Sequence, residues 1–208
     1  MLVSLLILMV VCGIFTGLGF YYVYSITSRH PTLPIASSQN LLLNLVSILS
    51  GISALFLANF VVLFFFLVFG IETGLESLVI AINIVPQLTM SEVFVIPQIL
   101  SLLIISIVII AFAEELLRIM PFVAAKAHPQ VFQNKGSILS LVLFVSTIFL
   151  TSLWFGFLHL NNFAYLCIAT IAGIFLSIQI TLTDNILSVV FTHGLYDFIL
   201  FSLTLGVI

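Results

Sequence analysis

Charged side chains are almost absent from this sequence. Only 5% of its 208 residues are charged, whereas 63% are hydrophobic and the mean hydropathy is +1.44. A soluble domain carries roughly a quarter charged residues. The composition therefore excludes a soluble globular protein and predicts an all-α membrane protein with several spans.

The sequence also lacks basic runs and a cysteine framework. With four Lys and Arg residues in the whole chain, no basic stretch is present that would indicate nucleic acid as a partner. Cys12 and Cys167 both lie in apolar stretches, and two such cysteines form neither a disulfide framework nor a metal-ligand spacing. The expected partner is the lipid bilayer, and nucleic acid is not expected as a partner.

Long apolar runs occupy most of the chain. A bilayer core takes about 20 apolar residues per helix, so the chain holds roughly six or seven spans in a single integral membrane domain, residues 1–208. The first run lacks the basic flank of a signal peptide and is expected to remain as the first helix. A short interfacial helix is predicted between Glu72 and Glu92. The spans are predicted at about 2–24, 41–70, 93–121, two within 136–183 divided at Asn161-Asn162, and from 185.

Six ionisable residues fall inside or at the ends of these apolar runs. A charged group at the centre of a membrane helix costs on the order of 2.5 to 3.5 kcal/mol, so it needs a partner, a cavity or a function. The six candidates are Glu114, Glu115, Arg118, His159, His193 and Asp197.

The first cluster is the segment EELLR. Arg118 lies four residues after Glu114 and three after Glu115, so on a helix it can reach either carboxylate. The other carboxylate would then be available as a general base. The alternative is a purely structural ion pair.

Two further pairs have the same four-residue spacing, which places both members on one helix face. Phe155 precedes His159, and the alternative for this histidine is a side chain that reaches interfacial water from a span end. His193 precedes Asp197, whose carboxylate can fix one tautomer of the imidazole or keep it protonated. The alternative for this second pair is a polar contact between packed helices.

The three segments EELLR, FGFLH and HGLYD together resemble the CAAX-protease and bacteriocin-processing (CPBP, Abi-like) family of intramembrane glutamate peptidases. The pattern of that family is Glu-Glu-x-x-x-Arg, then Phe-x-x-x-His, then His-x-x-x-Asn. The motif-bearing core here covers about 93–208. A related membrane peptidase family, which carries Glu in the middle motif, is a second and weaker match.

The resemblance implies a role for each motif residue. Glu114 and His159 would activate a water molecule, and His193 and Asp197 would take the oxyanion positions. Arg118 would hold the Glu pair and Phe155 would pack against the site. No cofactor and no metal ligand is implied.

Two positions depart from the family pattern. Only two residues separate Glu115 from Arg118, so an alignment on the arginine makes Glu114 the second Glu of the motif. Glu114 is the preferred base and Glu115 the alternative. Asp197 replaces the usual Asn, and an ionised carboxylate has no proton to donate to an oxyanion. Asp197 would instead keep His193 cationic, with His193 as the donor.

Counting residues along the predicted spans places two of these residues at different depths in the membrane. Glu114 falls in the inner half of the third span and His159 near the outer end of the fourth. A broken or re-entrant helix around Pro121 is therefore predicted, since irregular backbone is allowed in a membrane where it lines a cavity.

The sequence thus predicts an intramembrane endopeptidase for membrane-associated proteins or peptides, in the cell membrane of a prokaryote. A metal-dependent variant would use His159, His193 and a carboxylate, although no His-Glu-x-x-His motif is present. Buried ionisable residues are also compatible with a proton-coupled transporter, and a non-enzymatic immunity or scaffold protein is a further hypothesis. The sequence does not indicate the oligomeric state.

Overall fold

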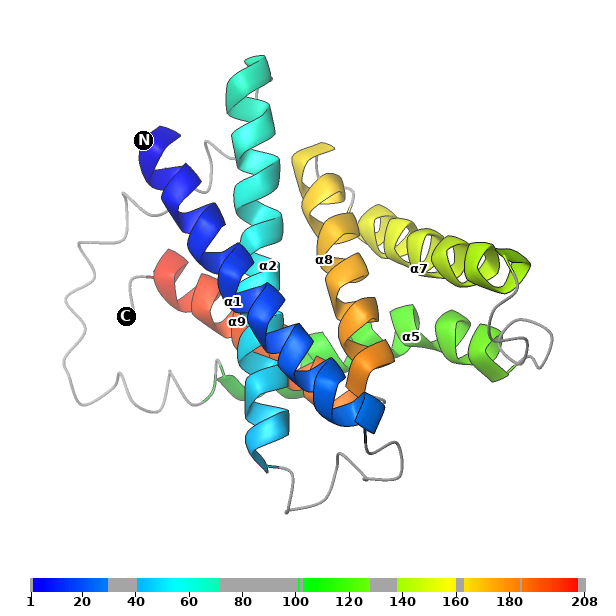
Figure 1. The fold of residues 1–208 in the computed structure, drawn as a ribbon. Helices are drawn as coiled ribbons and strands as arrows, with labels where there is room; N and C mark the ends of the chain where they lie inside the picture. The colour runs from blue at the N-terminus through cyan, green and yellow to red at the C-terminus, as the bar shows by residue number, and fades with distance from the viewer. Residues whose placement is uncertain are drawn as a thin grey trace.

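The regular elements of the protein are helices throughout the described part of the chain (Figure 1). The computed structural model describes residues 2–29, 41–71, 101–127 without residue 102, 138–159, 163–183 and 185–205. The prediction of an all-α bundle is confirmed. The interfacial helix predicted between Glu72 and Glu92 lies outside the described residues.

The long helices begin and end close to the predicted spans. They are α1 (Leu2–Arg29), α2 (Leu41–Phe69), α7 (Ile138–Leu158), α8 (Phe163–Thr183) and α9 (Ile186–Leu205). In hydrocarbon a helix is favoured because all its backbone groups are hydrogen-bonded within the segment. The predicted division of residues 136–183 into two spans is confirmed.

Four helical stretches in the described part are long and apolar enough to cross a membrane: Leu6–Ser25, Leu41–Phe69, Leu141–Leu158 and Phe163–Thr183. A shorter apolar stretch, Ile186–Leu200, lies in α9. The chain is therefore a multi-pass membrane protein. Large apolar side chains are exposed along α1, α2 and α7, as expected for surfaces that face lipid.

The third predicted span differs from the expectation. It contains a π-helix, η4 (Ile105–Ala111), followed directly by α5 (Phe112–Ala127). The predicted helix end and break at Pro121 are wrong, because α5 continues through this residue to Ala127. Proline is tolerated inside membrane helices, where neighbouring groups satisfy the freed backbone atoms.

Two helix ends show how the sequence sets the boundaries. The side-chain oxygen of Asn185 accepts hydrogen bonds from the backbone N–H groups of Leu187 (3.1 Å) and Ser188 (3.3 Å), which caps the N-terminus of α9. Gly70 follows α2 with a φ of +62°, and the N–H of Ile71 donates to the carbonyl of Phe66 at 2.9 Å. This is a Schellman ending, in which glycine adopts the left-handed conformation without strain.

The interior of the bundle is built mainly from α2, α8 and α9. Leu55, Leu176 and Val189 are each at most 1% exposed and belong to one buried cluster. Ile119 of α5 and Ile148 of α7 extend this cluster to the other two helices. In Figure 1, α5 and α7 lie on the same side of the molecule, and α1 lies across α2 on the other. One continuous core therefore ties the motif-bearing helices together.

Candidate active site

The two glutamates lie in the first turn of α5, immediately after the π-helix η4. Glu115 is fully buried, whereas the side chain of Glu114 is 28% exposed. The adjacent glutamates therefore have different environments, one closed and one open.

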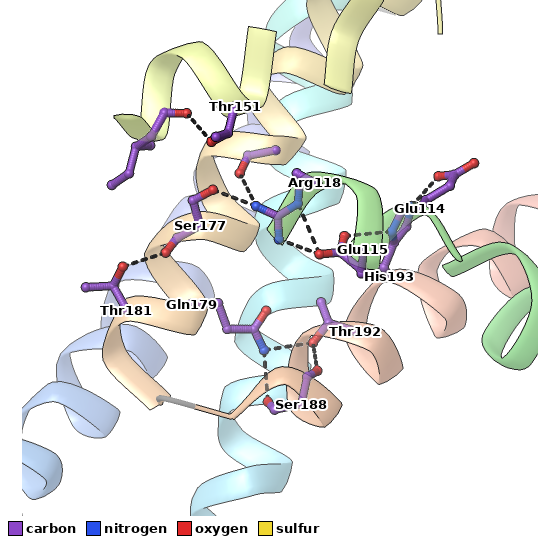
Figure 2. Close-up of polar contacts among 12 residues, drawn as sticks. Glu114, Glu115, Arg118, Thr151, Ser177, Gln179, Thr181, Ser188, Thr192 and His193 are labelled. Carbon is purple, nitrogen blue, oxygen red and sulfur yellow. Dashed lines mark hydrogen bonds and ion pairs between the residues drawn. The ribbon is translucent and has the colours of Figure 1, made fainter. Parts of the chain in front are cut away.

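Arg118 pairs with Glu115 and not with Glu114. Its Nε donates to Oε2 of Glu115 at 3.0 Å, and its Nη2 contacts the same oxygen. Its Nη1 donates to Oγ of Ser177 at 2.6 Å and to the carbonyl of Gly173 at 3.3 Å (Figure 2). Since the arginine is only 1% exposed, its charge is compensated entirely by protein groups.

His193 of α9 lies against the same carboxylate. Its Nδ1 is 3.0 Å from Oε1 of Glu115, and because a carboxylate only accepts, the nitrogen is the donor. Its Nε2 is 3.5 Å from Oδ2 of Asp197 and 3.6 Å from Oε2 of Glu114. Glu115 therefore bridges Arg118 and His193, and the second nitrogen of His193 faces two further carboxylates.

His159 approaches Glu114 from the end of α7. Its Nδ1 is 2.9 Å from the carbonyl of Phe155, so this nitrogen carries a hydrogen. Its Nε2 is 3.4 Å from Oε2 of Glu114. The hydrogen bond to the carbonyl thus fixes the ring so that Nε2 faces the glutamate, and in the neutral tautomer that nitrogen is an acceptor.

Phe155 packs between the two histidines. Its ring centroid is 4.6 Å from that of His159 and 5.7 Å from that of His193, with edge-to-face geometry in both contacts. The phenylalanine is 2% exposed. It therefore forms an apolar wall that limits the rotation of both imidazoles.

The structure brings together all seven residues that the sequence singled out. Glu114, His159 and Asp197 are partly exposed, at 28%, 30% and 15% of their side chains, whereas His193 is 8% exposed. The separation that residue counting suggested does not occur, because Glu114 lies at the start of α5 and His159 follows the end of α7. The first turn of one helix thus meets the last turn of the other.

Within the described residues, no group of three or more His, Cys, Asp or Glu side chains is arranged to hold a metal ion. The histidine nitrogens face carboxylates and a backbone carbonyl. What the geometry offers is an open carboxylate beside one histidine nitrogen that can accept a proton and another that can donate one.

Comparison with known proteins connects this geometry to a family. The family model described as "Type II CAAX prenyl endopeptidase Rce1-like" matches residues 96–199, which is half of the chain and contains every residue of the site. The chain belongs to the Rce1-like family. The predicted CPBP membership is thereby confirmed. Searches among curated proteins and among solved structures found no match.

The Rce1-like core also contains polar residues that sequence reasoning missed. Ser177 is fully buried and accepts a hydrogen bond from Arg118, one turn after the Gly173 carbonyl that accepts a second one. Gly173 and Ser177 are four residues apart in the sequence, which places them on one helix face. The sequence does not indicate that this face meets Arg118, which lies 59 residues before Ser177.

A second missed residue is Gln179, which is fully buried on α8. Its Nε2 contacts the hydroxyl oxygens of Ser188 at 3.1 Å, Thr192 at 2.8 Å and Ser47 at 3.0 Å (Figure 2 shows the first two residues). The available signal was a strongly polar amide within an apolar span, where such a group needs partners. Gln179 thus joins α2, α8 and α9 next to the site.

Proposed function

We propose that this Rce1-like protein is an intramembrane endopeptidase that hydrolyses peptide bonds of membrane-associated proteins or peptides. The observation that carries the proposal is the position of Glu114 Oε2, which lies 3.4 Å from Nε2 of His159 and 3.6 Å from Nε2 of His193. One carboxylate oxygen therefore faces both imidazoles at the open side of the cluster, where Glu114 and His159 are both partly exposed.

Glu114 is the general base in this proposal, and Glu115 holds the site together. Both oxygens of Glu115 are engaged, one by Arg118 and the other by His193, and the residue is closed to solvent. Within the described residues Glu114 has no arginine partner, and it is 28% exposed, so a water molecule can reach it. A base must lie within reach of the proton that it removes.

The chemistry follows from these positions. A water molecule held between Glu114 and Nε2 of His159 loses a proton to the carboxylate as its oxygen attacks the peptide carbonyl carbon. The same proton then passes from Glu114 to the leaving amine when the carbon–nitrogen bond breaks. The products are a carboxylic acid, which releases its remaining proton to solvent, and an amine, and the glutamate returns to its ionised form.

His193 is the donor to the oxyanion. Its Nδ1 hydrogen bond to Glu115 fixes the ring, and a cationic imidazole carries a second N–H at Nε2. Asp197 lies 3.5 Å from that Nε2 and favours the cation. A pre-positioned charged donor is the arrangement that stabilises developing negative charge.

The family description points to the substrate class to test first. It names CAAX prenyl endopeptidases, which suggests a lipid-modified peptide that is anchored in the membrane. Purified protein in liposomes is expected to cleave such an anchored peptide. Folded protein that leaves anchored peptides intact, with or without a prenyl group, would contradict the proposal.

Substitutions of Asp197 test whether this position contributes a charge or a hydrogen-bond donor to the oxyanion site. Asp197→Asn is expected to keep cleavage within about tenfold of the wild type, because the amide supplies an N–H donor of its own. Asp197→Leu supplies neither charge nor donor, and cleavage is expected to fall by about 10²-fold. Initial rates on the same anchored peptide measure both effects. Equal rates for Leu and Asn would show that position 197 has no electrostatic role.

A further inference from the structure

The π-helix η4 packs tightly against α9 at Gly194, the residue after His193. A Cβ atom placed on Gly194 would lie 2.6 Å from the backbone Cα of Ile107 and 2.7 Å from its Cγ1. Real Cβ atoms essentially never come this close to another heavy atom, and a backbone atom has no rotamer by which to retreat. Only glycine fits at this crossing.

The crossing is coupled directly to the site. Ile107 lies in η4 seven residues before Glu114, and both residues meet α9: Ile107 at Gly194, and Glu114 at His193, with Oε2 and Nε2 3.6 Å apart. On the other helix, Gly194 is bonded to His193. Any change in the separation of η4 and α9 at this point therefore changes the distances from His193 to Glu114 and Glu115.

We propose that Gly194 is a positioning residue, whose missing side chain lets η4 pack against α9 closely enough to hold Glu114 and Glu115 within reach of His193. The inference rests on the proposed peptidase function. The π-helical segment takes part because it carries Ile107 and leads directly into the Glu pair. Short π-helical segments inside α-helices occur frequently at functional sites.

Gly194→Ala is the direct test. The added methyl group forces η4 away from α9, and a displacement of about 1 Å at a reacting group can lower a rate by about 10²-fold. We expect kcat to fall by about 10- to 100-fold with KM within about twofold of the wild type. A raised KM with unchanged kcat would contradict a positioning role.

The chain offers two matched controls on α1. A Cβ at Gly17 meets nothing within 4 Å, so Gly17→Ala is expected to change neither kcat nor KM. A Cβ at Gly19 would lie 2.7 Å from the Cβ of Ser50 and would also contact its Oγ, so Gly19→Ala crowds the crossing of α1 and α2, which carries none of the motif residues. Gly19→Ala is expected to lower thermal stability and to leave kcat unchanged. An equal loss of kcat in Gly19→Ala and Gly194→Ala would show that general loosening explains the effect.

A second variant covers the case in which Gly194→Ala folds poorly. Ile107→Ala removes the Cγ1 that the new methyl group would meet, but the nearer Cα remains. The double variant Gly194→Ala/Ile107→Ala is expected to stay at least about tenfold below Ile107→Ala in kcat. Recovery to the rate of Ile107→Ala would overturn the proposal, because side-chain crowding alone would then account for the loss.

A spectroscopic measurement tests the position of His193 without relying on peptide cleavage. The ring-nitrogen signals of His193 in nitrogen-labelled protein report its hydrogen bond to Glu115, and His193→Gln assigns them among the four histidines. We expect these signals to move in Gly194→Ala and to remain in place in Gly17→Ala and Gly19→Ala. If wild-type protein cleaves no peptide but these shifts occur, the proposed function fails and the positioning role stands. Unchanged signals in Gly194→Ala overturn the positioning role.

Discussion

Cleavage is expected to fall by about 10²- to 10⁴-fold in Glu114→Gln, the range by which a positioned general base accelerates a reaction. The amide has nearly the shape of the carboxylate but cannot accept the proton of the attacking water. Because Arg118 pairs with Glu115 and Glu114 is partly exposed, the substitution leaves no buried arginine unpaired. The variant should therefore fold normally and bind substrate with little change in KM.

The measurement is the initial rate of cleavage of a membrane-anchored peptide by purified protein in liposomes. Glu76→Gln removes the same charge outside the three motifs and serves as the control. It should cleave at the wild-type rate. Cleavage by Glu114→Gln at a rate near that of the wild type would remove Glu114 from the mechanism and leave Glu115 as the alternative base.

Arg118→Leu is expected to lower the free energy of unfolding by about 3–5 kcal/mol, the cost of removing one partner from a buried ion pair. The substitution leaves Glu115 fully buried with His193 as its remaining partner. It also leaves the hydroxyl of Ser177 and the carbonyl of Gly173 without their shared donor. Denaturant unfolding in detergent micelles measures the loss.

The double variant Glu115→Leu/Arg118→Leu separates the structural from the chemical role of this pair. Replacing a whole buried ion pair by apolar residues is often neutral or stabilising, so most of the lost stability should return. Cleavage is nevertheless expected to be lost in the double variant, because Nδ1 of His193 has lost the carboxylate that fixes the ring. Recovery of both stability and cleavage would show that Glu115 does not position His193.

Much of the site could be predicted from the sequence because lipid penalises ionisable residues. Glu114, His159 and His193 are costly to place in an apolar chain, so each is a candidate for a functional role. The four-residue spacings show which side chains share a helix face without any knowledge of the fold. The span boundaries followed from the apolar runs for the same reason. The Rce1-like match then covered the three motifs together.

The arrangement of the third span could not be predicted. Its apolar run continues through η4 without a signal that would separate a π-helix from an α-helix, and Pro121 suggested a break that does not exist. The choice of Glu115 as the partner of Arg118 was equally open, because both glutamates are within reach on a helix. That choice depends on Ser177 and Gly173 of α8, which draw the guanidinium into the core.

The close approach at Gly194 was also invisible in the sequence. A glycine beside a histidine in a membrane helix predicts no particular neighbour, and the contact with Ile107 joins segments 87 residues apart. Contacts between distant helices depend on how the whole bundle packs. Motif spacing indicates which side chains share a helix face, whereas the packing of the helices determines how far apart these side chains lie.

The most direct test of the account is cleavage of an anchored peptide in water enriched in the heavy oxygen isotope, followed by mass spectrometry of the products. The account predicts that wild-type protein releases a fragment whose new carboxyl terminus contains one oxygen atom from the solvent, and that Glu114→Gln releases almost none. Folded wild-type protein that yields no fragment, or Glu114→Gln protein that yields as much labelled fragment as the wild type, would contradict it.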